Sequence, residues 1–165
     1  MQKALFPMLG LLVLGACADY RFTLNDKVVY TPEPLYSDYD IPDPQLNDCV
    51  FQTIKDHTLN AASQLEELNC SHAGVESLQG LQTFTSIKRL KLSSNAIYEL
   101  APLTDLRELT DLHLDNNQVV GLGALRGLPK LTYVDLRGNE NLNCADLDAF
   151  AHIPDIRSDL PEHCL

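Results

Sequence analysis

Basic residues are scarce in this chain of 165 residues, which has 12 Lys and Arg against 23 Asp and Glu and a formal net charge of −11. Nucleic-acid binding requires clusters of Lys and Arg that displace counterions from the phosphates. Attachment of a protein surface to anionic lipid requires similar clusters. We therefore expect no nucleic-acid partner, and no membrane contact through surface charge.

Motifs of the common catalytic sites are absent as well. The sequence contains no G-x-S-x-G, H-E-x-x-H, C-x-x-C, P-loop or G-x-G-x-x-G pattern. The glycine-rich stretch at 121–127 has the wrong spacing for a nucleotide-binding loop. We expect a protein without catalytic activity and without a cofactor. An enzyme with an unrecognised site is the least favoured alternative, because it needs a deep pocket with titratable residues of shifted pKa.

The N-terminal apolar run, at residues 9–14, is too short to span a bilayer as a helix. Lys3 precedes it and small residues follow, which is the three-part pattern of a secretory signal peptide. The alternative is a buried helix of the folded domain, which is disfavoured because Gly10 and Gly15 interrupt the run. We predict that residues 1–16 are a signal peptide.

The four residues from Leu14 to Cys17 resemble a bacterial lipobox, in which the signal is cut before the cysteine. The resemblance implies that Cys17 carries a diacylglycerol on sulfur and a further acyl chain on its amine. Several acyl chains together hold a protein almost permanently on a membrane. Retention in the inner membrane commonly requires Asp after the cysteine in Gram-negative lipoproteins, and Ala18 stands there in this chain. The resemblance therefore implies an outer-membrane lipoprotein, on the periplasmic side or at the cell surface.

Residues 17–46 are predicted to be a linker that follows the lipidated cysteine. Four prolines between positions 32 and 44 exclude a continuous helix or a central strand, and acidic residues keep the segment solvated. We expect a flexible spacer. Four of the chain's six tyrosines also lie here: Tyr20, Tyr30, Tyr36 and Tyr39. Because tyrosine is favoured at interfaces, the alternative is that the segment docks a partner or folds back on the domain.

From residue 65 the sequence repeats four times with a period of 22, in blocks that begin at Leu65, Ile87, Leu109 and Leu131. Apolar residues recur at positions 1, 4, 6, 11, 14, 17 and 20 of the block. This pattern resembles the leucine-rich repeat L-x-x-L-x-L-x-x-N-x-I-x-x-L-x-x-L-x-x-L, and its 22-residue bacterial type in particular. The resemblance covers residues 65–152. With the repeats and the lipobox together, the chain resembles a leucine-rich-repeat lipoprotein of the Gram-negative envelope.

The spacing of the repeat has a physical explanation. The segment L-x-L alternates with period two and predicts a short strand whose leucines face inward. The resemblance implies a right-handed α/β-type solenoid with a short parallel sheet on its concave face. An asparagine at position 9 is expected to bond backbone groups of neighbouring coils. This asparagine ladder consists of Asn95, Asn117 and Asn139.

Coils must stack to bury their apolar sides, and the terminal coils need caps. A helix over residues 47–64 is predicted to close the N-terminal end, with Asn47 or Asp48 as its cap. Its apolar residues recur at roughly helical spacing: Val50, Ile54 and Leu59. Residues 153–165 are the predicted C-terminal cap, and they begin like another coil with Ile153 and Ile156 at positions 1 and 4.

Four cysteines remain when Cys17 is lipidated, and in an oxidising compartment they allow three pairings. The favoured pairing is local, Cys49 with Cys70 and Cys144 with Cys164, and joins each cap to the neighbouring coil. Each bridge closes a loop of about 20 residues, which is worth about 3 kcal/mol on the chain-entropy model. The alternative for Cys70 is a small buried apolar side chain without a bridge.

Positions 3, 5 and 7 of each block face away from the core and are the predicted partner-binding surface. One interpretation is cross-strand charge pairing that keeps the sheet soluble, for example between Asp115 and Arg137. The other is a mixed-charge surface that recognises a protein or an extended peptide. The residues of this surface are Glu67, Asn69, Arg89, Lys91, Asp111, His113, Asp115, Tyr133, Asp135 and Arg137.

His113, Asp115 and Asp135 are the residues of this surface with the right chemistry for a metal ion. Exposed ligands on an open sheet lack the hydrogen-bonded neighbours that fix metal geometry, so we expect no metal. The favoured function is a monomeric, lipid-anchored interaction module of the cell envelope. A surface adhesin of the internalin type is the alternative, and it requires exposure outside the cell.

Overall fold

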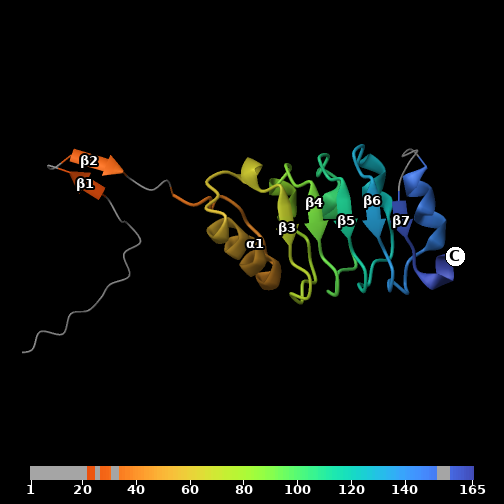
Figure 1. Ribbon diagram of the computed structural model, residues 1–165. Helices are drawn as coiled ribbons and strands as arrows, with labels where there is room; N and C mark the ends of the chain where they lie inside the picture. The colour runs from red at the N-terminus through yellow and green to blue at the C-terminus, as the bar shows by residue number, and fades with distance from the viewer. Residues whose placement is uncertain (1–21, 25–26, 31–33, 152–156) are drawn as a thin grey trace, which may run out of the picture. The chain divides into compact units, whose positions relative to one another are not determined.

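The computed structural model describes residues 22–24, 27–30, 34–151 and 157–165 (Figure 1). The chain divides into two compact units, Met1–Pro34 and Leu35–Leu165. In the first unit, strand β1 (Phe22–Leu24) pairs antiparallel with β2 (Lys27–Tyr30). The predicted linker therefore contains a hairpin. The predicted signal peptide, Cys17, Ile153 and Ile156 lie outside the described residues.

The second unit is a leucine-rich-repeat solenoid. One strand from each coil joins a parallel sheet in chain order (Figure 1): β3 (Glu67–Asn69), β4 (Arg89–Lys91), β5 (Asp111–His113), β6 (Tyr133–Asp135) and β7 (Arg157–Asp159). Short 3-10 helices form the return arms: Leu81–Thr83, Ala101–Leu103, Gly123–Gly127 and Cys144–Phe150. Among the described helices, none is long and apolar enough to cross a membrane.

The sheet has five strands, whereas the repeats predict four. Across β3 to β6 each residue pairs with the one 22 positions later, as Leu68 does with Leu90. At the last step Val134 pairs with Ser158, which is 24 positions later. The fourth coil is thus two residues longer than the others. For this reason the period of 22 does not locate β7.

The predicted apolar positions form one continuous core. All seven positions in each of the first three blocks are at most 2 % exposed. In the fourth block Leu142 is 4 % exposed and takes the place that the polar Asn141 leaves at position 11. Burial on this scale is the main stabilising term, at about 25 cal/mol for each Å² of apolar surface removed from water.

The asparagine at position 9 bonds two coils together. Asn117 donates from Nδ2 to the carbonyl oxygens of Leu92 (2.9 Å) and Leu114 (3.0 Å), and its Oδ1 accepts from the N–H of Ile97 (3.1 Å). Asn95 and Asn139 repeat this arrangement one coil earlier and one coil later. The predicted ladder therefore satisfies backbone groups that the three-residue strands leave unpaired.

Position 8 of each block, which precedes the ladder position, adopts a left-handed backbone. Position 8 holds His72, Ser94, Asn116 and Gly138, with φ of 60°, 57°, 56° and 69°. The backbone of a residue that carries a Cβ is strained in this region. A Cβ at Gly138 would also lie 2.5 Å from Oδ1 of Asn116. Only glycine therefore fits the last of these four turns without movement of a neighbour.

The N-terminal cap is helix α1 (Pro44–Asp56), followed by a 3-10 turn (Ala62–Gln64). The predicted start at residue 47 is three residues late, and neither Asn47 nor Asp48 is the cap. Asp43 caps the helix, since its Oδ1 accepts from the N–H of Leu46 at 2.9 Å, and Pro44 occupies the first helical position. Leu46, Val50 and Ile54 are at most 1 % exposed and close the end of the core.

The segment 35–43 belongs to the folded unit, contrary to the prediction of a spacer up to residue 46. Ile41 is 4 % exposed. Tyr36 and Tyr39 pack on Phe84, with ring centroids 6.1 and 5.5 Å from it. These contacts give the segment enough buried apolar surface to offset the entropy of ordering it. Of the two alternatives for the tyrosines, folding back on the domain is the one that Tyr36 and Tyr39 follow.

Both predicted disulfides are present. Cys49–Cys70 and Cys144–Cys164 have sequence separations of 21 and 20. The first joins α1 to the first coil. The second joins the last return arm to the final 3-10 turn (Glu162–Cys164).

Candidate binding surface on the parallel sheet

The strand register brings the predicted surface residues into columns. Glu67, Arg89, Asp111 and Tyr133 follow one another in the first column, and Asn69, Lys91, His113 and Asp135 in the second. The fifth strand pairs with β6 and adds Asp159 to the second column, which sequence reasoning missed. A contiguous outward face therefore crosses all five strands of the sheet.

At the β3–β4 end, Arg89 forms an ion pair with Glu67 on the neighbouring strand. Oδ1 of Asn69 accepts from the N–H of Ser71 at 3.2 Å, and Lys91 is exposed beside it. These strands enclose a shallow hollow of about 170 Å³ that is lined by Glu67, Asn69, Arg89 and Lys91. The hollow thus presents two cationic side chains, one carboxylate and one amide to an incoming group.

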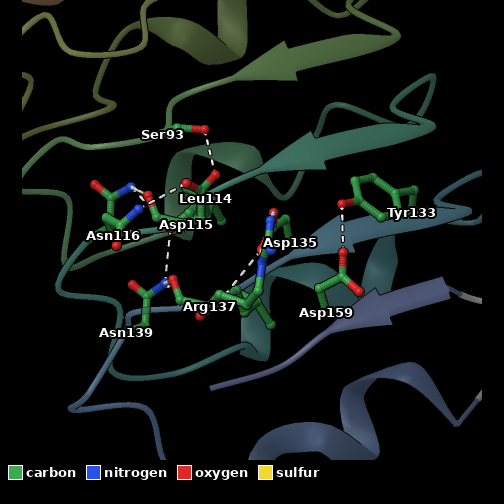
Figure 2. Close-up of polar contacts among 11 residues, drawn as sticks. Ser93, Leu114, Asp115, Asn116, Tyr133, Asp135, Arg137, Asn139 and Asp159 are labelled. Carbon is green, nitrogen blue, oxygen red and sulfur yellow. Dashed lines mark hydrogen bonds and ion pairs between the residues drawn. The ribbon is translucent and has the colours of Figure 1, made fainter. Parts of the chain in front are cut away.

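At the other end, Asp135 and Arg137 form a charged pair within one segment of chain (Figure 2). Oδ1 of Asp135 accepts from Nε of Arg137 at 2.9 Å and from its backbone N–H at 3.2 Å, and Oδ2 accepts from a terminal nitrogen of the guanidinium. Asp135 is 2 % exposed. Burial would raise the pKa of Asp135, but the hydrogen bonds and charge of Arg137 hold it below its ordinary value. The same bonds raise the pKa of Arg137.

Asp135 is therefore buried, whereas the sequence predicts it as part of the exposed binding surface. Arg137 covers it and is itself exposed. The predicted cross-strand pair of Asp115 with Arg137 is also wrong. Asp115 instead accepts hydrogen bonds from the hydroxyl of Ser93 and from Nδ2 of Asn116, the latter at 3.0 Å (Figure 2). Arg137 prefers Asp135 because the two residues share one strand face two positions apart.

Tyr133 connects β6 to β7. Its hydroxyl donates to Oδ2 of Asp159 at 2.8 Å (Figure 2), and its ring lies 5.1 Å from the ring of His113. Partial burial, the hydrogen bond to Asp159 and nearby negative charge raise the pKa of Tyr133 to about 12. The hydroxyl of Tyr133 therefore keeps its proton for the bond to Asp159, and its ring lies beside that of His113 on the sheet.

The shifted pKa values on this face have structural causes. Asp135, Arg137 and Tyr133 each interact with a charged or hydrogen-bonding neighbour that accounts for the direction of the shift. They lie on an open sheet and not in a deep pocket. The arrangement suits recognition by a fixed pattern of charges and rings better than it suits proton transfer to a substrate.

No protein-family model and no curated protein sequence match the chain. Solved structures do resemble it. An internalin (InlF) from Listeria monocytogenes superposes with a TM-score of 0.66 at 22 % identity, covering 74 % of this chain and 37 % of the internalin. Internalin C2 from the same organism gives a TM-score of 0.63 at 23 % identity, covering 73 % of this chain and 56 % of that protein.

The functional domain of InlJ from Listeria monocytogenes, which includes a cysteine ladder, gives a TM-score of 0.60 at 24 % identity. It matches over 71 % of this chain and 26 % of its own length. The chain therefore spans only part of each of these longer proteins. The fold that these comparisons and the geometry share is the internalin-type leucine-rich-repeat solenoid.

Proposed function

We propose that this chain is an exported protein-binding module that recognises its partner on the outward face of the parallel sheet. The observation that carries the proposal is the five-strand face itself, where exposed side chains stand on a rigid repeat scaffold. Solenoids use their sheets as extended binding surfaces. The likeness of the fold to the internalins supports the same kind of function.

The chemistry of this face favours a protein or peptide partner. Glu67, Arg89 and Lys91 offer mixed charge at one end, and His113 and Tyr133 offer aromatic rings near the other. Aromatic residues and arginines contribute much of the binding energy in protein interfaces. The module has no catalytic role in this proposal.

The size of the sheet limits the mode of binding. Five strands at a spacing of about 4.8 Å span about 20 Å, so the face covers a few hundred Å². A standard interface needs about 800 Å² from each partner. We propose that the sheet binds an extended segment, or that the partner also contacts the rims.

Export and anchoring form the second half of the proposal. Two disulfides are typical of proteins that fold in an oxidising compartment. The lipobox-like residues before Cys17 support an anchor in the outer membrane. Replacement of Cys17 by Ser should move the protein from the membrane fraction to the soluble fraction. Continued membrane association would reject the anchor.

Exposure at the cell surface distinguishes a surface adhesin from a periplasmic module. Protease treatment of intact cells removes an adhesin at the cell surface but spares a periplasmic module. The internalin-like fold favours testing the surface form first.

The binding face is tested by crosslinking capture from native membranes with Arg89→Glu. The matched control is Lys88→Glu, because Lys88 pairs with Glu66 one column away as Arg89 pairs with Glu67. We expect Arg89→Glu to weaken the capture of specific partners by at least about thirtyfold, the scale of an interface hot spot, while Lys88→Glu retains them. Equal capture by both variants would place the binding site elsewhere.

A further inference from the structure

We propose that His113, Asp115 and Asp135 form a binding site for a divalent transition-metal ion of the zinc or copper class. The metal-binding atoms of the three side chains lie within 4.8 Å of one another. They provide one imidazole nitrogen and two carboxylate oxygens. This inference does not depend on the protein-binding function, and its test contains no protein partner.

The sheet geometry places these three ligands as a tripod. His113 ends β5, and Asp115 lies two residues further along the same segment, so both side chains leave the same face. Asp135 is the residue directly opposite His113 on β6. Two ligands two residues apart, at the end of β5 and just beyond it, and a third across the ladder thus lie together on one face of the sheet.

Two of the three ligands are held in place by hydrogen bonds from neighbours, whereas the prediction of no metal assumes that such neighbours are missing. Arg137 fixes Asp135, and Ser93 and Asn116 fix Asp115. The ring of Tyr133 packs at 5.1 Å from the ring of His113. Such outer contacts orient the ligands of a metal site and typically change affinity by about 10–100-fold.

Arg137 leaves one lone pair of the Asp135 carboxylate available to a cation. Oδ1 accepts two hydrogen bonds from Arg137, whereas Oδ2 accepts one. A carboxylate oxygen has two lone pairs, so Oδ2 retains one for a cation. Ligands bound to zinc at about 2.0–2.2 Å lie closer together than 4.8 Å, so the proposal requires the side chains of His113 and Asp115 to rotate toward Asp135 when the ion binds.

The ligand set selects the class of ion. Imidazole suits zinc, copper, nickel and iron, while Ca²⁺ takes six to eight oxygen ligands. Three protein ligands also leave a coordination position open. Water or a side chain of a partner would take this position.

The surrounding charge weakens the site and provides an additional test. Lys91 lies beside His113 in the strand register, and Arg137 contacts Asp135. Both cations oppose a bound dication. Removing the charge of Lys91 while keeping its length should therefore strengthen metal binding.

A second group in the described part of the chain, Cys144, His163 and Cys164, also has clustered ligand atoms. Its two cysteines are joined in a disulfide. Sulfur binds metals as the thiolate, so this group does not compete in the oxidised protein.

The test is isothermal titration calorimetry of the purified full chain with ZnCl₂, and with CaCl₂ in parallel. We expect one saturable Zn²⁺ site and no saturable Ca²⁺ site. His113→Ala and Asp115→Asn should each weaken Zn²⁺ binding at least about tenfold, and Lys91→Met should strengthen it severalfold.

Two variants serve as controls, with circular dichroism to verify that every variant is folded. Asp111→Asn removes a carboxylate from the same strand but outside the tripod, and His57→Ala removes an exposed imidazole at the end of α1. Both should bind Zn²⁺ as the parent does. Absence of a saturable Zn²⁺ site up to millimolar concentration, or equal binding by folded His113→Ala, would overturn the proposal.

Discussion

The carboxylate of Asp43 accepts a hydrogen bond from the backbone N–H of Ser77 at 2.9 Å, although 34 residues separate the two in sequence. The same oxygen accepts from the N–H of Glu76, and the other oxygen caps α1 through Leu46. One buried side chain therefore starts the cap helix and attaches it to the first coil.

Because of Asp43, the free energy of unfolding of the solenoid should depend on pH in the acidic range. Burial would raise the pKa of Asp43, but hydrogen bonds from Leu46, Ser77 and Glu76 bring it below the ordinary value. A carboxylate with a lowered folded-state pKa stabilises the protein above its unfolded pKa, and that stabilisation is lost as the pH falls through the folded value. We expect the free energy of unfolding to decrease below about pH 4.

Asp43→Asn is the variant that isolates this effect. It should be less stable than the parent at pH 7, and the difference should shrink as the pH approaches 3. Urea unfolding at several pH values measures this. Asp48→Asn on the exposed side of α1 is the control and should follow the parent curve. A constant difference between Asp43→Asn and the parent at all pH values would contradict the assignment.

The segment before α1 also passes very close to Gly80. A Cβ at Gly80 would lie 2.1 Å from the carbonyl oxygen of Asp40, and the residue has a φ of +93°. Gly80→Ala must therefore displace the 35–43 segment or strain the turn. We expect a loss of about 2–4 kcal/mol in the free energy of unfolding. Gly123→Ala meets nothing within 4 Å and should be nearly neutral in the same denaturant experiment.

The core of the solenoid was predictable because its apolar residues recur in the sequence with a fixed period. Each coil repeats the same contacts, so Leu68, Leu90 and Leu112 had to be equivalent once the period of 22 was recognised. The local cysteine pairing followed from the same frame, since each pair lies near one end of the repeats. Periodic burial is a strong signal because a single coil cannot bury its apolar side alone.

The ends of the unit were less predictable because they do not repeat. Asp43 followed by Pro44 is a typical start of a helix, yet the prolines of this region were interpreted as signs of a linker. The two additional residues of the fourth coil concealed β7. On the surface, charge alternation predicted a cross-strand bond from Arg137 to Asp115. Periodicity carries no information on which of two nearby carboxylates an arginine selects.

The ladder asparagines should be far more sensitive to mutation than their exposed neighbours. Asn117→Ala leaves the buried N–H of Ile97 without its partner. It also removes one of the two hydrogen bonds to each of the carbonyls of Leu92 and Leu114, which Asn95 and Asn139 still satisfy. The unsatisfied N–H costs about 1–3 kcal/mol and each lost carbonyl bond about 0.5–1.5 kcal/mol, so we expect a loss of about 2–6 kcal/mol in the free energy of unfolding. Gln118→Ala, at an exposed adjacent position, should change the urea midpoint little. Similar midpoints for both variants would show that water replaces the ladder.

Tyr133 should ionise at unusually high pH. Its pKa is raised to about 12, first by burial and then by the hydrogen bond to Asp159. A tyrosine with a raised folded-state pKa contributes stability that is complete below pH 10 and is lost as the pH rises through about 12. Absorbance titration should show a late tyrosine step that disappears in Tyr133→Phe. Asp159→Asn should move this step to lower pH, and an unchanged step would contradict the role of Asp159.

The strained turns at position 8 are sites where a substitution can stabilise the protein. Ser94 has a φ of 57°, where a residue with a Cβ is strained by about 1–3 kcal/mol. Glycine removes this strain but adds about 0.5–1 kcal/mol of unfolded-state entropy. Ser94→Gly should therefore raise the free energy of unfolding by about 0.5–1 kcal/mol, measured by urea denaturation. Ser94→Ala also removes the hydroxyl but keeps the Cβ, so it should give no gain. Equal stabilisation by both variants would mean that the hydroxyl, and not the backbone, is the source of the strain.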